Sequence, residues 1–304
     1  MGIQPSSAPV PVEPTDPRPP GPRKMLRSER RGLLIATVSS VIVLGILVVG
    51  TILAPGSKEV QKAFFAPHHL KAASLGTHTP TAVTGSVIAA FFRVTVRMFL
   101  LAEVLVLVFA MFLAVVRSLA GPVTFPFRVL AIAYIDFFRG IPLLLLMFII
   151  AFGLPGMSLG FLSRQSTFAY GTAALVLVYS AYVAEVYRAG IESIHDSQTA
   201  AARALGLSRW QALRYVVLPQ AVRRVIPPLL NDFIGLQKDT ALVAAIGLVE
   251  VVRTAQAYGT TYFNFAGLSV AAALFVAITI PLARFTDYLI KRQQKKMRAG
   301  GGLR

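Results

Sequence analysis

The run LLIATVSSVIVLGILVVGTIL, residues 33–53, decides the class of fold. It contains 21 residues and no charge, and about 20 apolar residues are enough for a helix to cross a bilayer. A cleavable signal peptide is the alternative, because the preceding residues are basic. The run is long for the apolar part of a signal peptide, and no small-residue cleavage site follows it directly. We therefore predict an uncleaved membrane-spanning helix.

The whole chain has the composition of a polytopic membrane protein. Of its 304 residues, 55% are hydrophobic and 14% are charged, whereas soluble domains carry about 25% charged residues. This composition excludes a water-soluble domain, a disordered chain and a disulfide scaffold. Cysteine is absent, which also excludes a thiol nucleophile and a thiolate metal site.

Five further segments are predicted to enter the membrane after a polar outer loop at residues 54–85. Each is mainly apolar and long enough to reach across a bilayer, alone or with interruptions. They cover residues 94–116, 129–152, 168–186, 225–252 and 268–289. The predicted fold class is an all-α membrane protein with about six transmembrane helices.

The positive charges predict the orientation. The net charge is +17, and with six spans most of the Lys and Arg residues fall on one side. That side holds residues 1–32, 117–128, 187–224 and 293–304. Basic loops face the cytoplasm, so both termini are predicted to be cytoplasmic, with residues 1–32 as a disordered basic tail and 293–304 as a second basic tail. The charge excess then faces anionic lipid rather than nucleic acid.

The cytoplasmic segment DSQTAAARALGLSRWQAL, residues 196–213, predicts a helix, a tight turn and a second helix outside the membrane. Asp196 or Ser197 suits the N-cap of the first helix, and Gly206 suits its left-handed end. Ser208 and Gln211 form a capping-box pattern that begins the second helix. An alanine-rich helix surface permits close approach by another protein. A plain surface helix packed on its own chain is the alternative.

Residues 225–252 are predicted to form broken helices, because Pro227 and Pro228 remove two backbone donors. Half-length helices interrupted by proline, glycine and polar residues often line a substrate path. Glu103, inside the 94–116 span, is a further candidate for that path. The other candidate path-lining residues are Asn231, Asp232, Lys238, Asp239 and Thr240.

These charges also have structural interpretations. Lys238 would pair with a neighbouring aspartate and hold the helix break, and Glu103 would neutralise an arginine of another helix. Asp136 and Arg139 are three residues apart, which favours an ion pair, and Glu185 with Arg188 repeats that spacing. We therefore keep both interpretations of the charges within the spans.

Enzymatic residues are not found in the sequence. His68 and His69 favour a solvated pair over a metal site, and no metal-binding set is predicted. The sequence has no glycine-rich phosphate loop and no set of reactive side chains with suitable spacing. We predict a transport subunit rather than an enzyme.

Several stretches resemble the permeases of ABC importers. Ala201-Ala202, then Gly206, then Leu218-Pro219 resemble their EAA motif. Other stretches are similar, in order, to the polar amino-acid branch, which serves histidine, glutamate, glutamine, arginine and opines. They are Phe137–Leu144, Ala204–Gln211, Leu218–Ala221, Pro227–Asn231 and Lys238–Thr240.

The resemblance implies a five-helix permease core at residues 86–292 with a coupling loop at 195–219, preceded by the additional helix at 33–53. The implied function is ATP-driven import of polar amino acids across the cell (inner or plasma) membrane. The implied partners are a second permease subunit in a homo- or heterodimer, a cytoplasmic ABC ATPase and an extracytoplasmic solute-binding protein. The chain itself then needs no cofactor, because ATP and Mg²⁺ bind to the ATPase.

The same motif implies the residues that contact the ATPase. They are Ala200, Ala201, Ala202, Ala204, Leu205, Gly206, Leu207, Leu218 and Pro219. Ala200 stands where the family motif has Glu. With Ser197 as the N-cap, this position would be the third of the helix, and the loss of a reciprocal capping bond would cost about 1 kcal/mol or less. A heterodimer in which the partner has the intact motif would tolerate this change more easily.

An ion-coupled secondary amino-acid carrier or channel is the alternative function, with Glu103, Asp232 and Lys238 as the ion-coupled groups. It explains the charges within the spans but not the helix-turn-helix outside them. The sequence leaves the transported amino acid open. Charge complementarity with Glu103 and Asp232 favours a cationic one such as arginine or histidine, although the binding protein usually sets selectivity in this family.

Overall fold

The computed structural model describes residues 22–76, 85–119 and 121–300, which contain helices and no strands. The chain divides into two compact units, residues 1–59 and residues 60–304. Residues 1–21 of the predicted N-terminal tail and residues 77–84 of the predicted outer loop lie outside the described residues.

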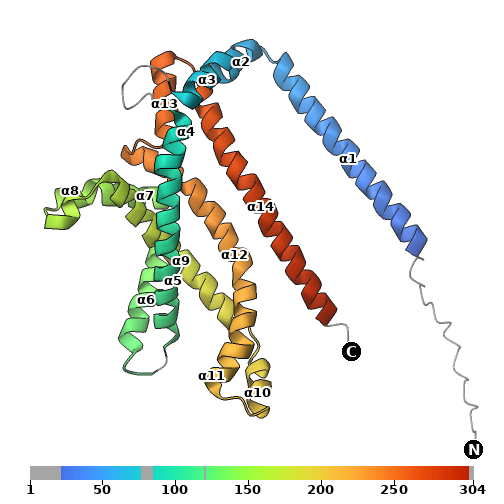
Figure 1. Ribbon diagram of the computed structural model, residues 1–304, viewed down its shortest axis with the longest axis vertical. Coiled ribbons are helices and arrows are strands. Elements are labelled where there is room, and N and C mark those ends of the chain that lie inside the picture. The colour runs from blue at the N-terminus through green and yellow to red at the C-terminus, as the bar shows by residue number, and fades with distance from the viewer. Residues whose placement is uncertain (1–21, 77–84, 120, 301–304) are drawn as a thin grey trace, which may run out of the picture. The chain divides into compact units, whose positions relative to one another are not determined.

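The first unit contains α1 (Pro22–Leu53) and the beginning of α2 (Ser57–Phe65) (Figure 1). The predicted apolar helix at 33–53 is confirmed, but it begins earlier, at Pro22. The expectation that residues 22–32 are disordered is therefore wrong. Proline fits the first turn of a helix, where its missing N–H would have no partner, and the Arg and Lys residues that follow are good helix formers.

In the second unit, helical structure occupies part of the predicted outer loop. The rest of α2 is followed by α3 (Pro67–Leu75), which packs against α14 (Ala266–Gly300). The backbone N–H of Phe265 donates to the carbonyl of Ala63 at 2.7 Å. The prediction of a loop at 54–85 is wrong for these residues, because short polar helices carry no membrane-like apolar signal.

The first helix of the predicted core is longer than the sequence indicated. It combines α4 (Val87–Ala90), the π-helical turn η1 (Phe91–Val96) and α5 (Arg97–Ser118). The helical segment from Val87 to Ser118 includes the whole predicted 94–116 span and extends it at both ends.

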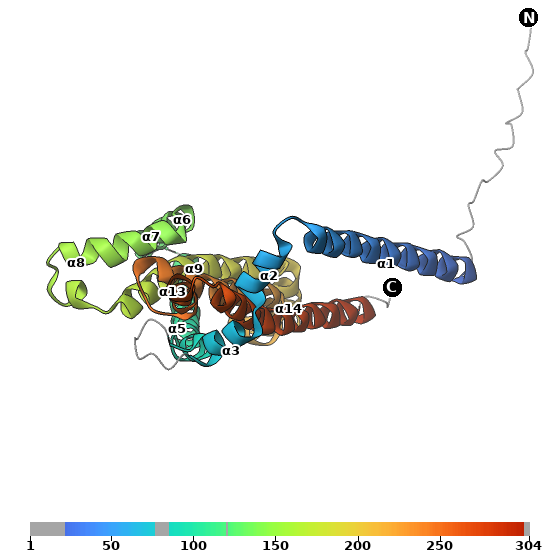
Figure 2. The same ribbon diagram turned by 90° about the horizontal axis from the view of Figure 1, so that it is seen from above.

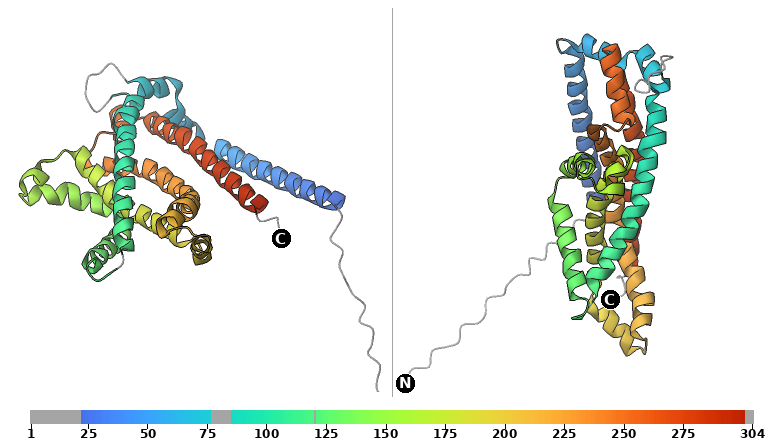
Figure 3. Two further views of the ribbon diagram at one scale, coloured as in Figure 1. Left: turned by 60° about the horizontal axis from the view of Figure 1, so that its bottom comes forward. Right: turned by 90° about the vertical axis from the view of Figure 1, so that its left-hand side faces the viewer.

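The predicted span at 129–152 is not one straight helix. α6 (Phe125–Gly140) and the segment Leu143–Gly156, which begins with α7 (Leu143–Phe148), are bent by 103°. The change of direction can be followed in Figure 3. Pro142 disfavours helical backbone at the residue before it, and Ile141 is extended, with φ −94° and ψ 132°. The chain continues through η2 (Ile149–Gly153), α8 (Leu154–Gly156) and η3 (Gly160–Arg164).

The long helix α12 (Leu218–Asp239) continues through Pro227 and Pro228. The prediction that these prolines break it is wrong, since neighbouring helices can support a proline-containing membrane helix. The break instead comes at the 3₁₀ segment η5 (Thr240–Ile246), which ends at Gly247 in the left-handed conformation, with φ +87°. α13 (Val251–Tyr262) follows it and lies mostly beyond the predicted 225–252 segment.

The predicted number of about six spans agrees with the higher of two possible counts. Among the residues that the structure describes, three segments are long and apolar enough to cross a membrane alone: Val87–Ser118, Thr167–Glu192 and Ala266–Arg292. The count rises to six when each of three bent pairs is taken as one span. These pairs join Thr37–Leu53 to Ser57–Leu75, Phe125–Gly140 to Leu143–Gly156, and Trp210–Ile246 to Val251–Tyr262.

The core of the second unit forms around α9 (Thr167–Glu192). Seen from above, α9 lies between α5 and α6 and contacts both (Figure 2). Two glycines bring it close to the later helices. Gly171 faces Val243 of η5, and Gly190 faces Val225 of α12. The absence of a side chain at these two positions therefore sets the spacing of the bundle.

Replacement of Gly190 by alanine is expected to destabilise the protein. A Cβ at this position would overlap Cγ2 of Val225, and valine has little rotamer freedom in a helix. Overpacking of this kind costs about 1–3 kcal/mol, so the apparent melting temperature in detergent should fall by about 5 °C. Gly153→Ala is the matched control, because nothing lies within 4 Å of its added Cβ. Equal melting temperatures for both variants would contradict the packing described.

Candidate functional site

The predicted helix-turn-helix is present at one end of the second unit. α10 (Asp196–Ala204) and α11 (Arg209–Ala212) lie there together, whereas α13 lies at the opposite end (Figure 1). Gly206 ends α10 in the left-handed conformation, with φ +87°, as predicted. The segment then continues through the π-helical turn η4 (Leu213–Val217) into α12.

The N-cap of α10 differs from the prediction. The residue is His195, whose ring Nδ1 accepts a hydrogen bond from the backbone N–H of Ser197 at 3.3 Å. Asp196 and Ser197 are therefore helical residues, not caps. Ala200 accordingly lies beyond the third helical position, so the expectation that it removes a reciprocal capping bond is wrong.

The capping box of the second helix is confirmed. The hydroxyl of Ser208 accepts from the backbone N–H of Gln211 at 3.2 Å, and the side chain of Gln211 accepts from the N–H of Ser208 at 2.8 Å. These two bonds satisfy two N–H groups at the beginning of α11 that would otherwise have no partner.

The residues predicted to contact an ATPase differ in their exposure to solvent. Ala202 is buried and Leu207 is half-buried, whereas the others are exposed. The exposed ones are Ala200, Ala201, Ala204, Leu205, Gly206, Leu218 and Pro219. Leu205 is 84% exposed, and Trp210 beside the turn is 66% exposed. Two large apolar side chains are thus exposed at this turn, and the sequence analysis missed Trp210.

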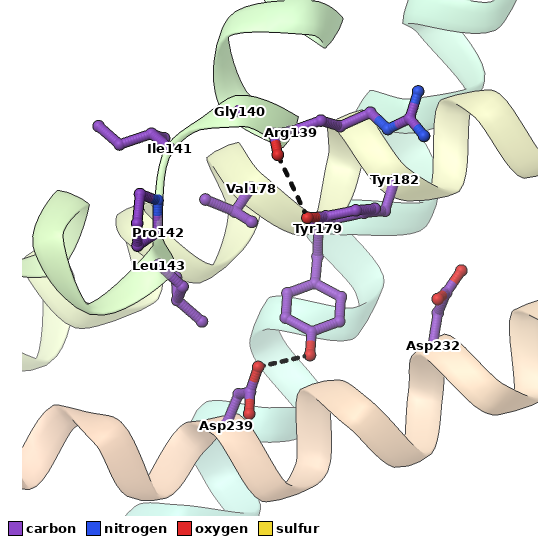
Figure 4. Close-up of a pocket in the computed structure, with 10 residues that line it drawn as sticks. All are labelled: Arg139, Gly140, Ile141, Pro142, Leu143, Val178, Tyr179, Tyr182, Asp232 and Asp239. Carbon is purple, nitrogen blue, oxygen red and sulfur yellow. Dashed lines mark hydrogen bonds between the residues drawn. The ribbon is translucent and has the colours of Figure 1, made fainter.

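A cavity of about 500 Å³ lies between the α6–α7 bend, α9 and α12 (Figure 4). The bend contributes backbone and apolar side chains, α9 contributes two tyrosines, and α12 contributes two aspartates. The lining residues are Arg139, Gly140, Ile141, Pro142, Leu143, Val178, Tyr179, Tyr182, Asp232 and Asp239.

Two tyrosines of α9 organise the cavity wall (Figure 4). The hydroxyl of Tyr179 donates to the carboxylate of Asp239 at 2.8 Å, and Gly235 leaves room for this hydroxyl to approach α12. The hydroxyl of Tyr182 donates to the carbonyl of Arg139 at 3.4 Å. Tyr179 therefore ties the acidic side of the cavity to α9, and Tyr182 ties the bend to α9.

Arg139 does not make the predicted ion pair. Its guanidinium lies 5.7 Å from the centre of the Tyr182 ring, a cation–π contact. Within the described ranges no salt bridge joins it to Asp136. The similar prediction for Glu185 and Arg188 is confirmed, with a nitrogen–oxygen distance of 2.8 Å.

Glu103 and Asp232 are two half-buried carboxylates of α5 and α12. The two helices approach each other in this region, where the rings of Phe99 and Phe233 lie 4.6 Å apart. Oδ2 of Asp232 is buried, and the described part of the chain provides no hydrogen-bond partner for it. No salt bridge of Glu103, Asp232 or Lys238 occurs among the same residues. The structural alternatives, in which arginine neutralises Glu103 or Lys238 pairs with an aspartate, are thus not observed.

The structure brings only some of the predicted path residues together. Asp232 and Asp239 line the cavity, and Glu103 lies on α5, which approaches α12 in this region. Asn231 and Lys238 are exposed and do not line this cavity, and Thr240 is buried, with its hydroxyl donating to the carbonyl of Gln237 at 2.7 Å. Tyr179 and Tyr182 were missed. Their three-residue spacing within an apolar helix was the available signal.

Comparison with known proteins places these features in context. The family model described as "Binding-protein-dependent transport system inner membrane component" matches residues 118–298. The chain is 37% identical to "Probable glutamine ABC transporter permease protein GlnM" of Bacillus subtilis (strain 168), over 64% of this chain and 90% of that protein. It is 36% identical to "Arginine transport system permease protein ArtQ" of the same organism, over 62% and 85%.

Two solved structures share the fold. A crystal structure of an amino acid ABC transporter with histidines has 31% identity and a TM-score of 0.61, covering 67% of this chain and 94% of that chain. An inward-facing conformation of the MetNI methionine ABC transporter has 17% identity and a TM-score of 0.55, covering 68% and 95%. The second comparison concerns the fold alone.

Tyr179→Phe is expected to destabilise the protein more than Tyr182→Phe. The first change keeps the ring but leaves the carboxylate of Asp239 without its phenolic donor, which costs about 1–3 kcal/mol. The hydroxyl of Tyr182 has a longer contact, and its side chain is 40% exposed, so water can replace the bond. The measurement is the apparent melting temperature of both variants in detergent. An equal or larger decrease for Tyr182→Phe would contradict this account.

Proposed function

This chain belongs to the family of binding-protein-dependent transport system inner membrane components. We propose that it works as a permease subunit and that a separate ATPase drives it by docking on α10. Its relatives are permease subunits of amino-acid ABC importers, and the chain is a multi-pass transport component of the same kind. The ion-coupled carrier is not favoured, because the related proteins belong to ATP-binding-cassette systems.

The observation that carries this proposal is the exposed turn at the end of α10. Leu205 is 84% exposed on it, Gly206 fixes its conformation, and the capping box of α11 holds it rigid. A rigid turn can transmit a rigid-body motion from a docked protein. The sequence contains no phosphate-binding loop, so ATP and Mg²⁺ would bind to the docked ATPase, and this chain would need no cofactor.

The proposed cycle uses both ends of the second unit. A loaded solute-binding protein docks at the extracytoplasmic end, which holds α13, and ATP closes the ATPase dimer at the end that holds α10. The displacement of α10 opens the cavity to the outside, and ATP hydrolysis returns it to face inward. A second permease subunit, identical or different, completes the transporter in the cell membrane, with both termini of this chain in the cytoplasm.

Gly206→Asp is expected to weaken docking of the ATPase and so to uncouple ATP hydrolysis from transport. The substitution places a side chain and a negative charge on the exposed turn, in a backbone conformation that disfavours Cβ. Loss of a central docking contact typically costs 2 kcal/mol or more, so co-purification of the ATPase and ATP-driven uptake should each fall by about tenfold or more. The measurements are pull-down in mild detergent and uptake by proteoliposomes.

Gly160→Asp is the matched control for this substitution. Gly160 also has a positive φ, +59°, and nothing within 4 Å of an added Cβ, but it lies in η3, outside the predicted coupling loop. Its ATPase binding and uptake should be those of the wild type. If Gly206→Asp retains the same bound ATPase with unchanged uptake, the docking assignment fails.

The acidic cavity supports a cationic amino acid as the preferred substrate. Glu103 and Asp232 are half-buried carboxylates of two helices that approach each other, Asp239 is bound by Tyr179, and none of the three has a salt bridge within the described segments. A positively charged side chain or α-amino group would relieve the repulsion between Glu103 and Asp232. Arginine and histidine have this chemistry, while glutamine offers only its α-amino group.

Neutralising Glu103 or Asp232 is expected to weaken binding of a cationic substrate selectively. Glu103→Gln and Asp232→Asn should each raise the Kd of the permease–ATPase complex for radiolabelled L-arginine by about tenfold, and the Kd for L-glutamine by less. Asp136→Asn is the control, because this carboxylate of α6 is exposed, whereas Glu103 and Asp232 are half-buried. Equal or tighter binding of L-glutamine by the wild type would exclude the cationic preference.

A further inference from the structure

A chain of four alternating charges joins α5 to the end of α9 that precedes α10. Glu185 of α9 forms salt bridges with Arg117 of α5 and with Arg188, and Arg188 also pairs with Glu192. Both Nε and Nη2 of Arg188 donate to Glu185, at 3.0 and 2.8 Å. The side chains of Arg117 and Glu185 are only 22% and 15% exposed, so water screens this pair less than it screens a surface pair.

The Arg117–Glu185 contact differs from the other salt bridges of the described residues. Each of the others joins two residues three or four positions apart within one helix. This contact joins two helices, at the last turn of α5. The packing of α5 on α9 is otherwise apolar and extends along both helices. The fold therefore does not need this ion pair to bring the helices together.

The end of α9 is also fixed to the beginning of α12. The guanidinium of Arg224 donates to the carbonyl of Ser193. Ile194 packs with Val217 and Ala221 in a small separate core. Because α10 begins at Asp196, directly after these contacts, the end of α9, α10 and the beginning of α12 form one connected group.

α5 leads from this connected group to the cavity. Phe99 of α5 lies with its ring 4.6 Å from that of Phe233 of α12, which brings the helix that carries Glu103 against the helix that carries Asp232. A displacement of α10 would reach Tyr179 and Asp232 through α9 and α12 themselves. It would reach Glu103 through α5, which is joined to α9 by apolar packing along both helices and, at this end, by the ionic contact at Arg117.

We propose that Arg117 is a positioning residue that makes α5 follow the movement of α10, so that Glu103 and Asp232 change position together. This inference rests on the proposed function, because it takes α10 to be displaced by an ATPase. Without the link, the ATPase would still dock and hydrolyse ATP, but the apolar contacts between α5 and α9 can slide past one another, so Glu103 would follow Asp232 less closely. The expected defect is therefore an increase in the ATP hydrolysed per solute transported, without loss of the assembled complex.

The test measures the number of ATP molecules hydrolysed per solute transported, in proteoliposomes that contain the complete transporter and its binding protein. Arg117→Gln should raise this ratio by at least about fivefold, the lower range of typical coupling effects, with unchanged ATPase binding. Arg117→Lys keeps the charge and should restore the ratio to within about twofold of the wild type. Arg284→Gln, which removes the exposed pair with Asp287 on α14, is the control and should not change it.

A covalent link provides a second, independent test. The chain has no cysteine, so Arg117→Cys combined with Glu185→Cys introduces the only two thiols. Before treatment the double variant should be uncoupled, like Arg117→Gln. A short bifunctional thiol-reactive crosslinker should then lower the ATP-to-solute ratio toward that of the wild type in the same sample, which excludes a folding defect as the cause.

The outcomes separate this proposal from the one on which it rests. If the wild type shows no ATP-dependent uptake, the proposed function fails. If the wild type is active but Arg117→Gln keeps its ratio, or loses uptake and hydrolysis in equal proportion, the positioning role is wrong. A crosslinked double variant that remains uncoupled would overturn it as well.

Discussion

Irregular backbone inside a bilayer is stable only where protein or enclosed water satisfies its polar groups, and this constraint shapes the second unit. The chain leaves regular helix at Ile141–Pro142 and again at η5 (Thr240–Ile246). The two irregular segments are not isolated: η5 contacts both α7 and α9. Gly171 of α9 leaves room for Val243 and Ile246. The cavity lies beside these breaks, so the same packing that supports irregular backbone also creates the site.

The helices that could be predicted from the sequence are those that contain a long apolar run. The helices around residues 94–116 and 168–186 were found for that reason. The bend at Pro142 and the continuity of α12 through Pro227 and Pro228 were not, because tertiary support decides whether a proline breaks a helix. α2 and α3 were missed because they are short and polar. Sequence position alone also did not reveal that His195, and not Asp196 or Ser197, caps α10.

The candidate site shows a similar division. Ionisable groups within apolar segments are rare, so Glu103, Asp232 and Asp239 were recognisable from the sequence. Tyr179 and Tyr182 were not, since tyrosine in a membrane helix is unremarkable until its hydroxyl is seen to contact a carboxylate or a carbonyl. Thr240 was overestimated, because a helix break can bury a hydroxyl by bonding it to its own backbone. Depth of burial and direction of side chains are tertiary properties.

The two consecutive prolines of α12 change how this helix bends. Each proline omits the amide that would bond to the carbonyl four residues earlier, which concerns the carbonyls of Arg223 and Arg224. Bending therefore meets less resistance there than elsewhere along α12. The soft point lies between the turns that adjoin α10 and the turn that carries Asp232. A small rotation of the end of α12 next to α10 can thus bend the helix at the prolines. The bend angle, rather than a translation of the whole helix, would then set how far the carboxylate of Asp232 moves.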